Sequence, residues 1–151
     1  MEKFKTVYDI LLWAVEEEDK AYNLYLNLSK KSVDIRTRTF LEQISRDELK
    51  HKVVFSSFVK KNEEEFRTQK IDSIEIPLFH KVPDVEMTNI ISILKFAISN
   101  EIVSNNLYIQ LAYSITSNPL VQKVLFKFAD EENKHKAGLE LELEYYNGKV
   151  D

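Results

Sequence analysis

The chain has 151 residues and a net charge of −4, with 44% hydrophobic and 30% charged residues, which argues against disorder and against a basic nucleic-acid-binding protein. It contains no cysteine, which excludes disulfides, thiol nucleophiles, iron–sulfur clusters and zinc–thiolate sites. It also has only 2 glycines and 3 prolines, fewer than a sheet protein of this length normally needs for its turns. We therefore expect one domain, residues 1–151, built from long helices with few connections.

The amino-terminal segment gives no sign of export or membrane insertion. The acidic run Glu16–Asp19 comes before any apolar stretch long enough for a signal sequence. A run of about 20 apolar residues, as a membrane span requires, is absent from the sequence. The expectation is a cytoplasmic protein that binds neither membranes nor nucleic acids.

Apolar periodicity predicts four helices in two pairs. The expected ranges are residues 4–31, 34–61, 86–117 and 119–147. A polar, irregular stretch at residues 62–83, which contains Pro77 and Pro83, separates the pairs and is interpreted as a long connection. The predicted fold class is therefore all-α: an antiparallel four-helix bundle made of two helical hairpins and one long crossover.

Capping signals support these boundaries. Ser32 or Asp34 is suited to cap the second helix, and Asn118 followed by Pro119 is a typical start for the fourth. Gly148 is expected to end the fourth helix.

Each predicted helix has one apolar face, and a glutamate interrupts each face near its middle. The first two faces are Val7, Leu11, Ala14, Glu18, Ala21, Tyr25, Leu28 and Leu41, Ile44, Glu48, His51, Phe55, Phe58. The other two are Ile90, Leu94, Ala97, Glu101, Ser104, Tyr108, Leu111 and Val121, Leu125, Phe128, Glu132, His135, Leu139, Leu143. Four carboxylates and two imidazoles are thus expected at one depth of the core.

The two hairpins also resemble each other in sequence. Each has a lone glutamate on its first helix and a Glu-x-x-His pair on its second, and the separations from lone to paired glutamate are 30 and 31 residues. This internal repeat predicts a site with pseudo-two-fold symmetry between the hairpins.

The chemistry of this set favours a pair of metal ions. Residues at i and i+3 share a helical face, so each Glu-x-x-His pair directs one oxygen and one nitrogen ligand to the same point. Four buried carboxylates repel one another, and two divalent cations would cancel their charge. Iron or manganese suits this oxygen-rich set, and zinc is a further candidate. A metal-free polar network in the core is the alternative.

The six-residue pattern resembles the ferritin-like diiron-carboxylate proteins, and most closely the rubrerythrin group. The resemblance covers essentially the whole chain. It implies that Glu18 and Glu101 are terminal ligands, that Glu48 and Glu132 bridge two iron ions, and that His51 and His135 give each iron one nitrogen ligand. It further implies an oxidoreductase that reduces hydrogen peroxide or dioxygen.

Differences in sequence from these relatives limit the electron source, the cofactors and the storage role that we expect for this chain. Rubrerythrins of the best-known type have another carboxylate one turn after the lone glutamate of the third helix, where this chain has Ser104. Because this chain has no cysteine for a rubredoxin site, electrons are expected from an external donor protein. Haem is not expected, because Leu49 replaces the methionine that binds haem in bacterioferritins. Shell-type iron storage is disfavoured, because no sequence remains for a fifth helix.

Four further residues are candidates to support the ligands. Tyr25 and Tyr108 lie two turns after the lone glutamates and are suited to donate to a ligand carboxylate, or only to fill the core. Asp47 and Glu131 each precede a paired glutamate and are suited to accept the free N–H of a ligand imidazole, or only to form surface salt bridges.

Two other functions remain open from the sequence. One is an iron-binding or ferroxidase protein without peroxide turnover, and the other is a non-enzymatic helical module whose metal is structural or absent. A homodimer is expected, with an exposed face around Trp13 as an example of its interface.

Overall fold

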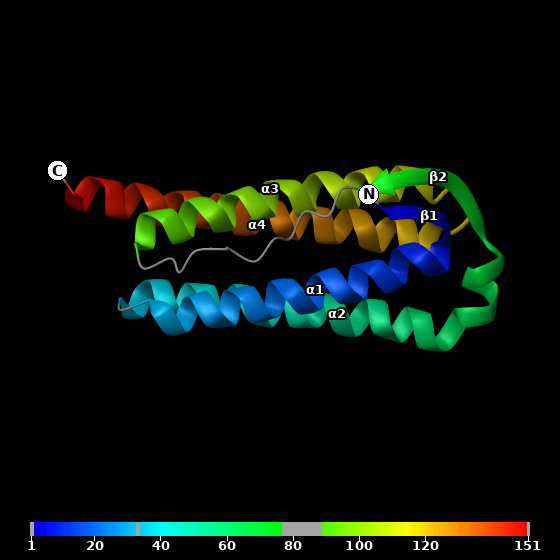
Figure 1. The fold of residues 1–151 in the computed structure, drawn as a ribbon, viewed down its shortest axis with the longest axis horizontal. Coiled ribbons are helices and arrows are strands. Elements are labelled where there is room, and N and C mark those ends of the chain that lie inside the picture. The colour runs from blue at the N-terminus through cyan, green and yellow to red at the C-terminus, as the bar shows by residue number, and fades with distance from the viewer. Residues whose placement is uncertain (1, 33, 77–88, 151) are drawn as a thin grey trace.

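A computed structural model describes residues 2–32, 34–76 and 89–150. Its helices are α1 (Val7–Lys31), α2 (Ile35–Thr68), α3 (Ile90–Ser114) and α4 (Pro119–Val150). The helices α1 and α2 form one antiparallel hairpin and α3 and α4 form another, and the hairpins lie side by side along their length (Figure 1). Because α2 and α3 run in the same direction, the hairpins are joined by a crossover, as predicted. The predicted four-helix fold class is confirmed.

Side-chain caps fix the starts of the helices. Thr6 and Asp9 form a reciprocal capping box at the start of α1. Asp34 caps α2 by accepting from the backbone N–H of Arg36, and Asn118 caps α4 by accepting from that of Val121 at 3.1 Å. Asp34 is thus the cap of the second helix, whereas Ser32 ends the first.

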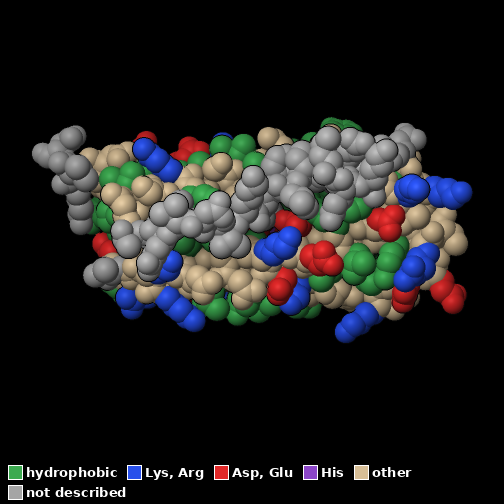
Figure 2. Space-filling model, in the orientation of Figure 1, with side chains coloured by type: hydrophobic (Ala, Val, Ile, Leu, Met, Phe, Trp, Pro, Cys, Tyr) green, Lys and Arg blue, Asp and Glu red, His purple; other side chains and the backbone are tan. Residues whose placement is uncertain are grey.

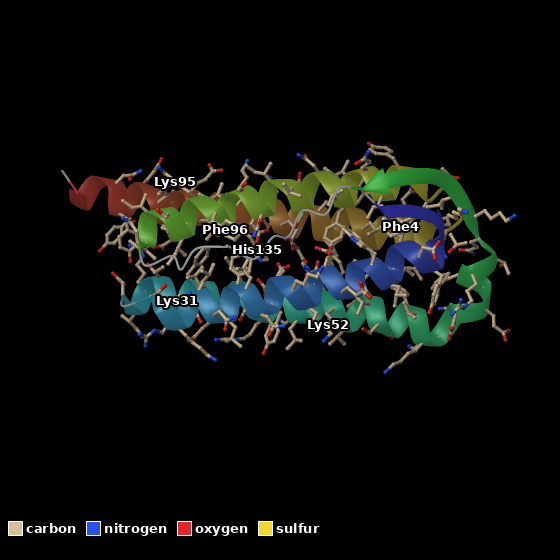
Figure 3. The ribbon with its side chains drawn as sticks, viewed as in Figure 1. Phe4, Lys31, Lys52, Lys95, Phe96 and His135 are labelled. Carbon is tan, nitrogen blue, oxygen red and sulfur yellow. The ribbon has the colours of Figure 1, made fainter. Side chains whose placement is uncertain are left out.

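The predicted inward faces are the buried ones. All members of the four faces are buried except Phe58, Ile90 and Leu143, which are half-buried. The buried apolar residues form two clusters, one between the middle of the bundle and the end that carries the strands, and one toward the opposite end. Figure 3 shows Phe4 near the strand end and His135 between the hairpins farther along the bundle. The polar layer lies where the two clusters meet.

Two short strands, which the sequence analysis did not predict, lie at one end of the bundle. Strand β1 (Glu2–Thr6) pairs antiparallel with β2 (Lys70–Ile76), with Phe4 opposite Ile74 and an irregularity between Phe4 and Thr6. The prediction that the first helix begins at residue 4 is therefore wrong. Phe4 is buried edge-on against Trp13, with 5.8 Å between ring centroids, and this contact anchors the strand to the core.

Four other predicted helix ends differ from the structure, and one of them is the end of the third helix, which lies at Ser114 and not at residue 117. The second helix continues to Thr68 through a kink at Asn62, because Phe66 is buried and holds the additional turns against the core. The third begins after the Asn89 cap, and residues 86–88 lie outside the described part of the chain. The fourth continues past Gly148 to Val150, since neither glycine has a positive φ that would end the helix.

The sequence analysis gave an exposed face around Trp13 as an example of a dimer interface, and this example is wrong. Trp13 is only 5% exposed and packs within its own chain, so its surface is not available to a partner. On the face seen in Figure 2, acidic and basic side chains are interspersed over the surface. None of the helices, over the residues described, has an apolar stretch long enough to cross a bilayer.

Candidate metal centre

All four helices contribute to one buried polar layer. Glu18 comes from α1, Glu48 and His51 from α2, Glu101 from α3, and Glu132 and His135 from α4. None of these six residues is more than 8% exposed. The structure therefore brings together all six candidate ligands of the sequence analysis.

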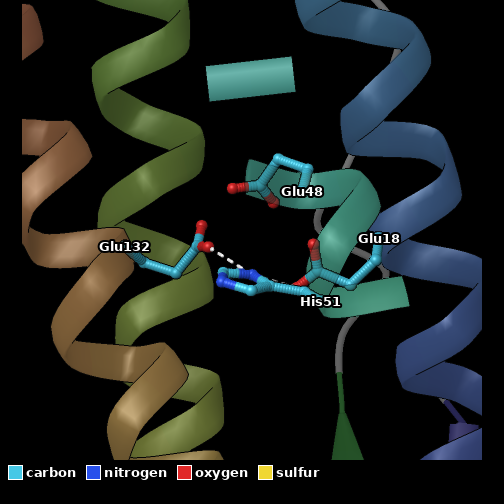
Figure 4. Close-up of side chains that lie close together, drawn as sticks. All are labelled: Glu18, Glu48, His51 and Glu132. Atoms are coloured by element: carbon cyan, nitrogen blue, oxygen red, sulfur yellow. Dashed lines mark ion pairs between the residues drawn. The ribbon is translucent and has the colours of Figure 1, made fainter. Parts of the chain in front are cut away.

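Their ligand atoms form two overlapping groups. Glu18, Glu48, His51 and Glu132 form one, and Glu48, Glu101, Glu132 and His135 form the other. Within each group, one ligand atom from each residue lies within 4.8 Å of the others. Figure 4 shows the first group, with the His51 ring between the carboxyl groups of Glu18 and Glu132. Because Glu48 and Glu132 belong to both groups, they lie where ligands shared by two ions would have to lie.

The layer contains polar atoms that the protein itself leaves without hydrogen bonds. Among the described residues, seven buried side-chain nitrogen or oxygen atoms have no hydrogen-bond partner. One is the amide nitrogen of Asn100. The other six come one from each candidate ligand: Glu18 Oε2, Glu48 Oε1, His51 Nδ1, Glu101 Oε2, Glu132 Oε1 and His135 Nδ1. The Nδ1 atoms of His51 and His135 lie 3.3 Å from Glu132 Oε1 and 3.2 Å from Glu48 Oε1, so these atoms approach one another without forming hydrogen bonds. Buried polar atoms without hydrogen bonds are rare and costly, and their concentration in one layer favours an additional partner.

Each histidine makes a contact on the outer side of the layer with the opposite hairpin. The Nε2 atom of His51 lies 2.5 Å from Glu131 Oε2, and that of His135 lies 3.0 Å from Asp47 Oδ2. A carboxylate at Nε2 keeps a proton on that nitrogen and orients the ring so that Nδ1 faces the layer. Asp47 and Glu131 thus contact imidazoles as expected, but each contacts the histidine of the other hairpin.

The two tyrosines also contact carboxylates across the hairpins. The Tyr108 hydroxyl donates to Glu18 Oε1, and the Tyr25 hydroxyl donates to Glu101 Oε1 at 2.5 Å. Burial, together with the charge of Glu101, raises the pKa of Tyr25 well above 10, so its phenol stays protonated and remains a donor. Both tyrosines therefore donate to a carboxylate of the layer, which is one of the two roles that the sequence analysis left open.

Burial makes ionisation of the two central carboxyls unfavourable. Burial raises the pKa of Glu48 well above 4.5, and repulsion from Glu132 raises it further. The pKa of Glu132 is raised by burial and by the charge of Glu101. Burial also opposes the charge of Glu18, but the His51 imidazole 3.4 Å away, together with the hydrogen bond from Tyr108, prevails and lowers the pKa of that carboxyl. In the metal-free protein, the two central glutamates are therefore the groups that tend to retain protons.

The surrounding carboxylates favour positively charged imidazoles when no metal is bound. Burial alone would lower the pKa of His51, but the carboxylates of Glu132 and Glu18 raise it to about 11. In the same way Glu101 outweighs the effect of burial on His135, whose pKa is raised to about 9. The protein thus partly balances four acidic side chains with two protonated histidines.

The donor set fits two divalent cations better than it fits protons. Two such ions would supply four positive charges to four carboxylates, let both imidazoles be neutral, and give a ligand bond to each of the six atoms that lack a hydrogen bond. Four oxygen donors and two nitrogen donors suit iron or manganese, and also zinc. The residues present therefore fit a di-metal group.

The backbone arrangement matches a solved structure. A crystal structure of a Thermotoga maritima protein, provisionally described as a ferritin-like diiron-carboxylate protein, superposes with a TM-score of 0.76 over 95% of this chain and 97% of that chain. The chain has the ferritin-like fold. At 24% sequence identity, this similarity establishes the architecture of the ferritin-like bundle and not its chemistry. No protein-family model and no curated protein sequence matches the chain.

The sequence analysis found every member of the polar layer but not the exchange of partners between hairpins. Asp47 lies four residues before His51 in the sequence, which suggested a contact on one helix. The pseudo-symmetry of the ferritin-like bundle instead places Asp47 beside His135. The repeat itself contained the signal, because Asp47 and Glu131 are both one residue before a paired glutamate.

Proposed function

We propose that this chain is a diiron-carboxylate oxidoreductase of the rubrerythrin type that reduces hydrogen peroxide or dioxygen with electrons from a separate donor protein. One observation carries the proposal: each of the six residues that match the family pattern contributes one buried atom without a hydrogen-bond partner to the same layer, where these atoms face one another. The ferritin-like fold and the description of the Thermotoga maritima protein support the same interpretation.

The grouping of atoms divides the ligands between two ions. Glu18 and His51 would serve one ion and Glu101 and His135 the other, while Glu48 and Glu132 would be shared. This proposed division agrees with the roles that the family resemblance implies. When bound, a pair of ferrous ions supplies the two electrons that reduce a peroxide.

The protein's own side chains hold the ligands in position for that chemistry. Tyr108 and Tyr25 each donate to one oxygen of a lone glutamate, so the other oxygen remains free for the layer. Glu131 and Asp47 hold the histidine rings and their Nε2 protons in the same way. The apolar clusters on both sides restrict water, which strengthens every charge interaction within the layer.

The first test measures metal content and the reaction with peroxide. Anaerobically purified protein should contain about two metal ions per chain by elemental mass spectrometry, and stopped-flow mixing of the ferrous form with hydrogen peroxide should show rapid oxidation. A Glu48→Ala, Glu132→Ala variant removes both shared ligands, and a Glu140→Ala, Glu144→Ala variant is the control on exposed positions of α4. Oxidation in the shared-ligand variant as fast as in the unmodified protein would reject the proposal.

The same experiment separates the alternatives. Uptake of many irons per chain with assembly into a large shell, and no turnover of peroxide, would identify an iron-handling protein instead. Two tightly held redox-inactive ions, such as zinc, with no reaction toward oxidants, would indicate a structural centre. Retention of activity by iron and by no other metal would identify the native metal.

A further inference from the structure

We propose that the groove between α2 and α4 binds an amphipathic organic anion, with its apolar part along the groove and its charge held by lysines. The groove has a volume of about 830 Å³, and among the described residues its lining side chains lie between positions 46 and 54 of α2 and between positions 127 and 135 of α4. This volume is within the range of about 300–1,000 Å³ that is typical of small-molecule sites. The groove reaches the polar layer from outside, because His51 and His135 also line it, but the proposed anion site does not depend on the proposed oxidoreductase function.

Apolar side chains supply a wall for a hydrocarbon group. Leu49 and Val53 lie one helical turn apart on α2, both line the groove, and they are 36% and 60% exposed. Phe128 lines the groove from α4 and stacks on the His51 ring, with 4.0 Å between ring centroids. The apolar surface therefore extends from the exposed edge of the groove to the imidazole at its base.

Charge in the groove is predominantly positive. Four cationic side chains line it: Arg46, Lys50, Lys127 and Lys134. Two acidic residues, Asp47 and Glu131, line it as well, but each is engaged with a histidine. The groove is thus unsuited to a free metal cation and complementary to an anion.

Two of the four cations have no competing ion pair. Arg46 lies 3.6 Å from Glu42, and Lys134 lies 3.2 Å from Asp130 on its own helix. Within the part of the chain that the structure describes, no such partner faces Lys50 or Lys127. Lys50 and Lys127 come from opposite walls, so a carboxylate or similar headgroup between the helices is within the reach of flexible side chains from both sides.

Decanoate is a suitable probe because it combines a hydrocarbon chain with one negative charge. Isothermal titration of the full chain should show saturable binding of decanoate, with decanol and acetate at least about tenfold weaker because each lacks one of the two features. Decanol binding as tight as that of decanoate would remove the role of the lysines. Acetate binding as tight as that of decanoate would remove the role of the apolar wall. Either result would overturn the proposal.

Matched charge reversals test the location of the site. Lys50→Glu with Lys127→Glu should weaken decanoate binding about tenfold or more, whereas Lys60→Glu with Lys95→Glu changes the net charge equally and should leave it unchanged. Circular dichroism checks that both variants retain their helices. The measurements with decanol and acetate use the unmodified protein, so a folding defect in a variant would not affect them. Equal loss in both variants would overturn the proposed site. Occupation of the groove by a second copy of the chain would also overturn the proposal. Ultracentrifugation would show this as a dimer that dissociates only in the Lys50→Glu, Lys127→Glu variant and that decanoate does not affect.

Discussion

The Nε2 atom of His51 on α2 lies 2.5 Å from Oε2 of Glu131 on α4, a residue 80 positions away in the sequence. The pair formed by His135 and Asp47 repeats this relationship with the hairpins exchanged. Each hairpin therefore holds the imidazole of the other, and the two contacts connect α2 to α4 on the outer side of the polar layer. The side chains of Asp47 and Glu131 are 30% and 35% exposed, so these contacts reach solvent whereas the layer itself does not.

Replacing the outer carboxylate should weaken metal binding without removing a ligand. In Glu131→Gln, the charged acceptor for the Nε2 proton of His51 is lost, and we expect metal affinity to fall about 10- to 100-fold. Competition with a chelator of known affinity measures the change. Glu140→Gln, on an exposed position of the same helix, is the matched control. Unchanged affinity in Glu131→Gln would show that its contact with His51 is only a surface ion pair.

Replacing a shared glutamate should affect the metal-free and metal-bound proteins in opposite directions. Glu48→Gln removes one of four buried carboxylates that repel one another, so the metal-free variant should be more stable than the unmodified protein at pH 8, by about 1 kcal/mol or more. The variant should also lose the stabilisation by metal, which is about 2.7 kcal/mol per site when free metal is at 100 times its Kd. Thermal unfolding with and without metal measures both effects. Destabilisation of the metal-free variant would contradict the interpretation that repulsion dominates the layer.

The stability of the metal-free protein should fall as the pH rises from 6.5. The pKa of His135 is about 9 and that of His51 about 11 in the folded protein, both above the ordinary value of 6.5. A raised histidine pKa gives stability that is complete below pH 6.5 and is lost as the pH rises through the folded-state value. The raised pKa values of Glu48 and Glu132 act in the same direction, because these carboxyls hold protons more tightly when folded.

Metal should reverse this dependence on pH. Binding displaces protons from the imidazoles and carboxyls, so the increase in Tm caused by metal should grow between pH 6 and pH 8. Thermal unfolding of chelated and metal-loaded protein across this range measures both trends. A metal-induced increase that is constant with pH would show that protons and metal do not compete for these atoms.

The polar layer could be predicted from the sequence because the residues on the apolar face of each periodic pattern are also the residues that are buried in the bundle. Apolar packing does not account for a glutamate on an otherwise apolar helix face. Four such glutamates at matching positions therefore indicated where the site would lie. The outer contacts were harder to assign, because residues four apart on one helix and residues on facing helices are equally plausible partners for His51. The packing of the two hairpins decides which of these partners the histidine contacts, and this packing cannot be inferred from the spacing of residues in the sequence.

The strands were missed for a different reason. β1 is only five residues long, and its apolar residue Phe4 also fits the start of a helical pattern. The pair Thr6 and Asp9 contained the local signal, since a capping box places the start of α1 at Val7. In the segment of β2, Ile74 and Ile76 alternate with polar residues, but pairing between residues about 70 positions apart is a tertiary property.

The contact between Gly138 and Phe40 gives a test of how tightly α2 and α4 pack beside the layer. A Cβ atom at Gly138 would lie 2.5 Å from Phe40 Cζ, closer than packed atoms can approach, so Gly138→Ala should force the ring to move. The steric cost of about 1–3 kcal/mol should outweigh the gain of about 1 kcal/mol that alanine normally brings to a helix. Gly148→Ala is the matched control, because no heavy atom lies within 4 Å of its added carbon. That variant should be unchanged or slightly more stable in denaturant unfolding. Adding Phe40→Leu to Gly138→Ala should recover part of the loss, and a stabilised Gly138→Ala variant would show that the Phe40 ring moves aside without cost.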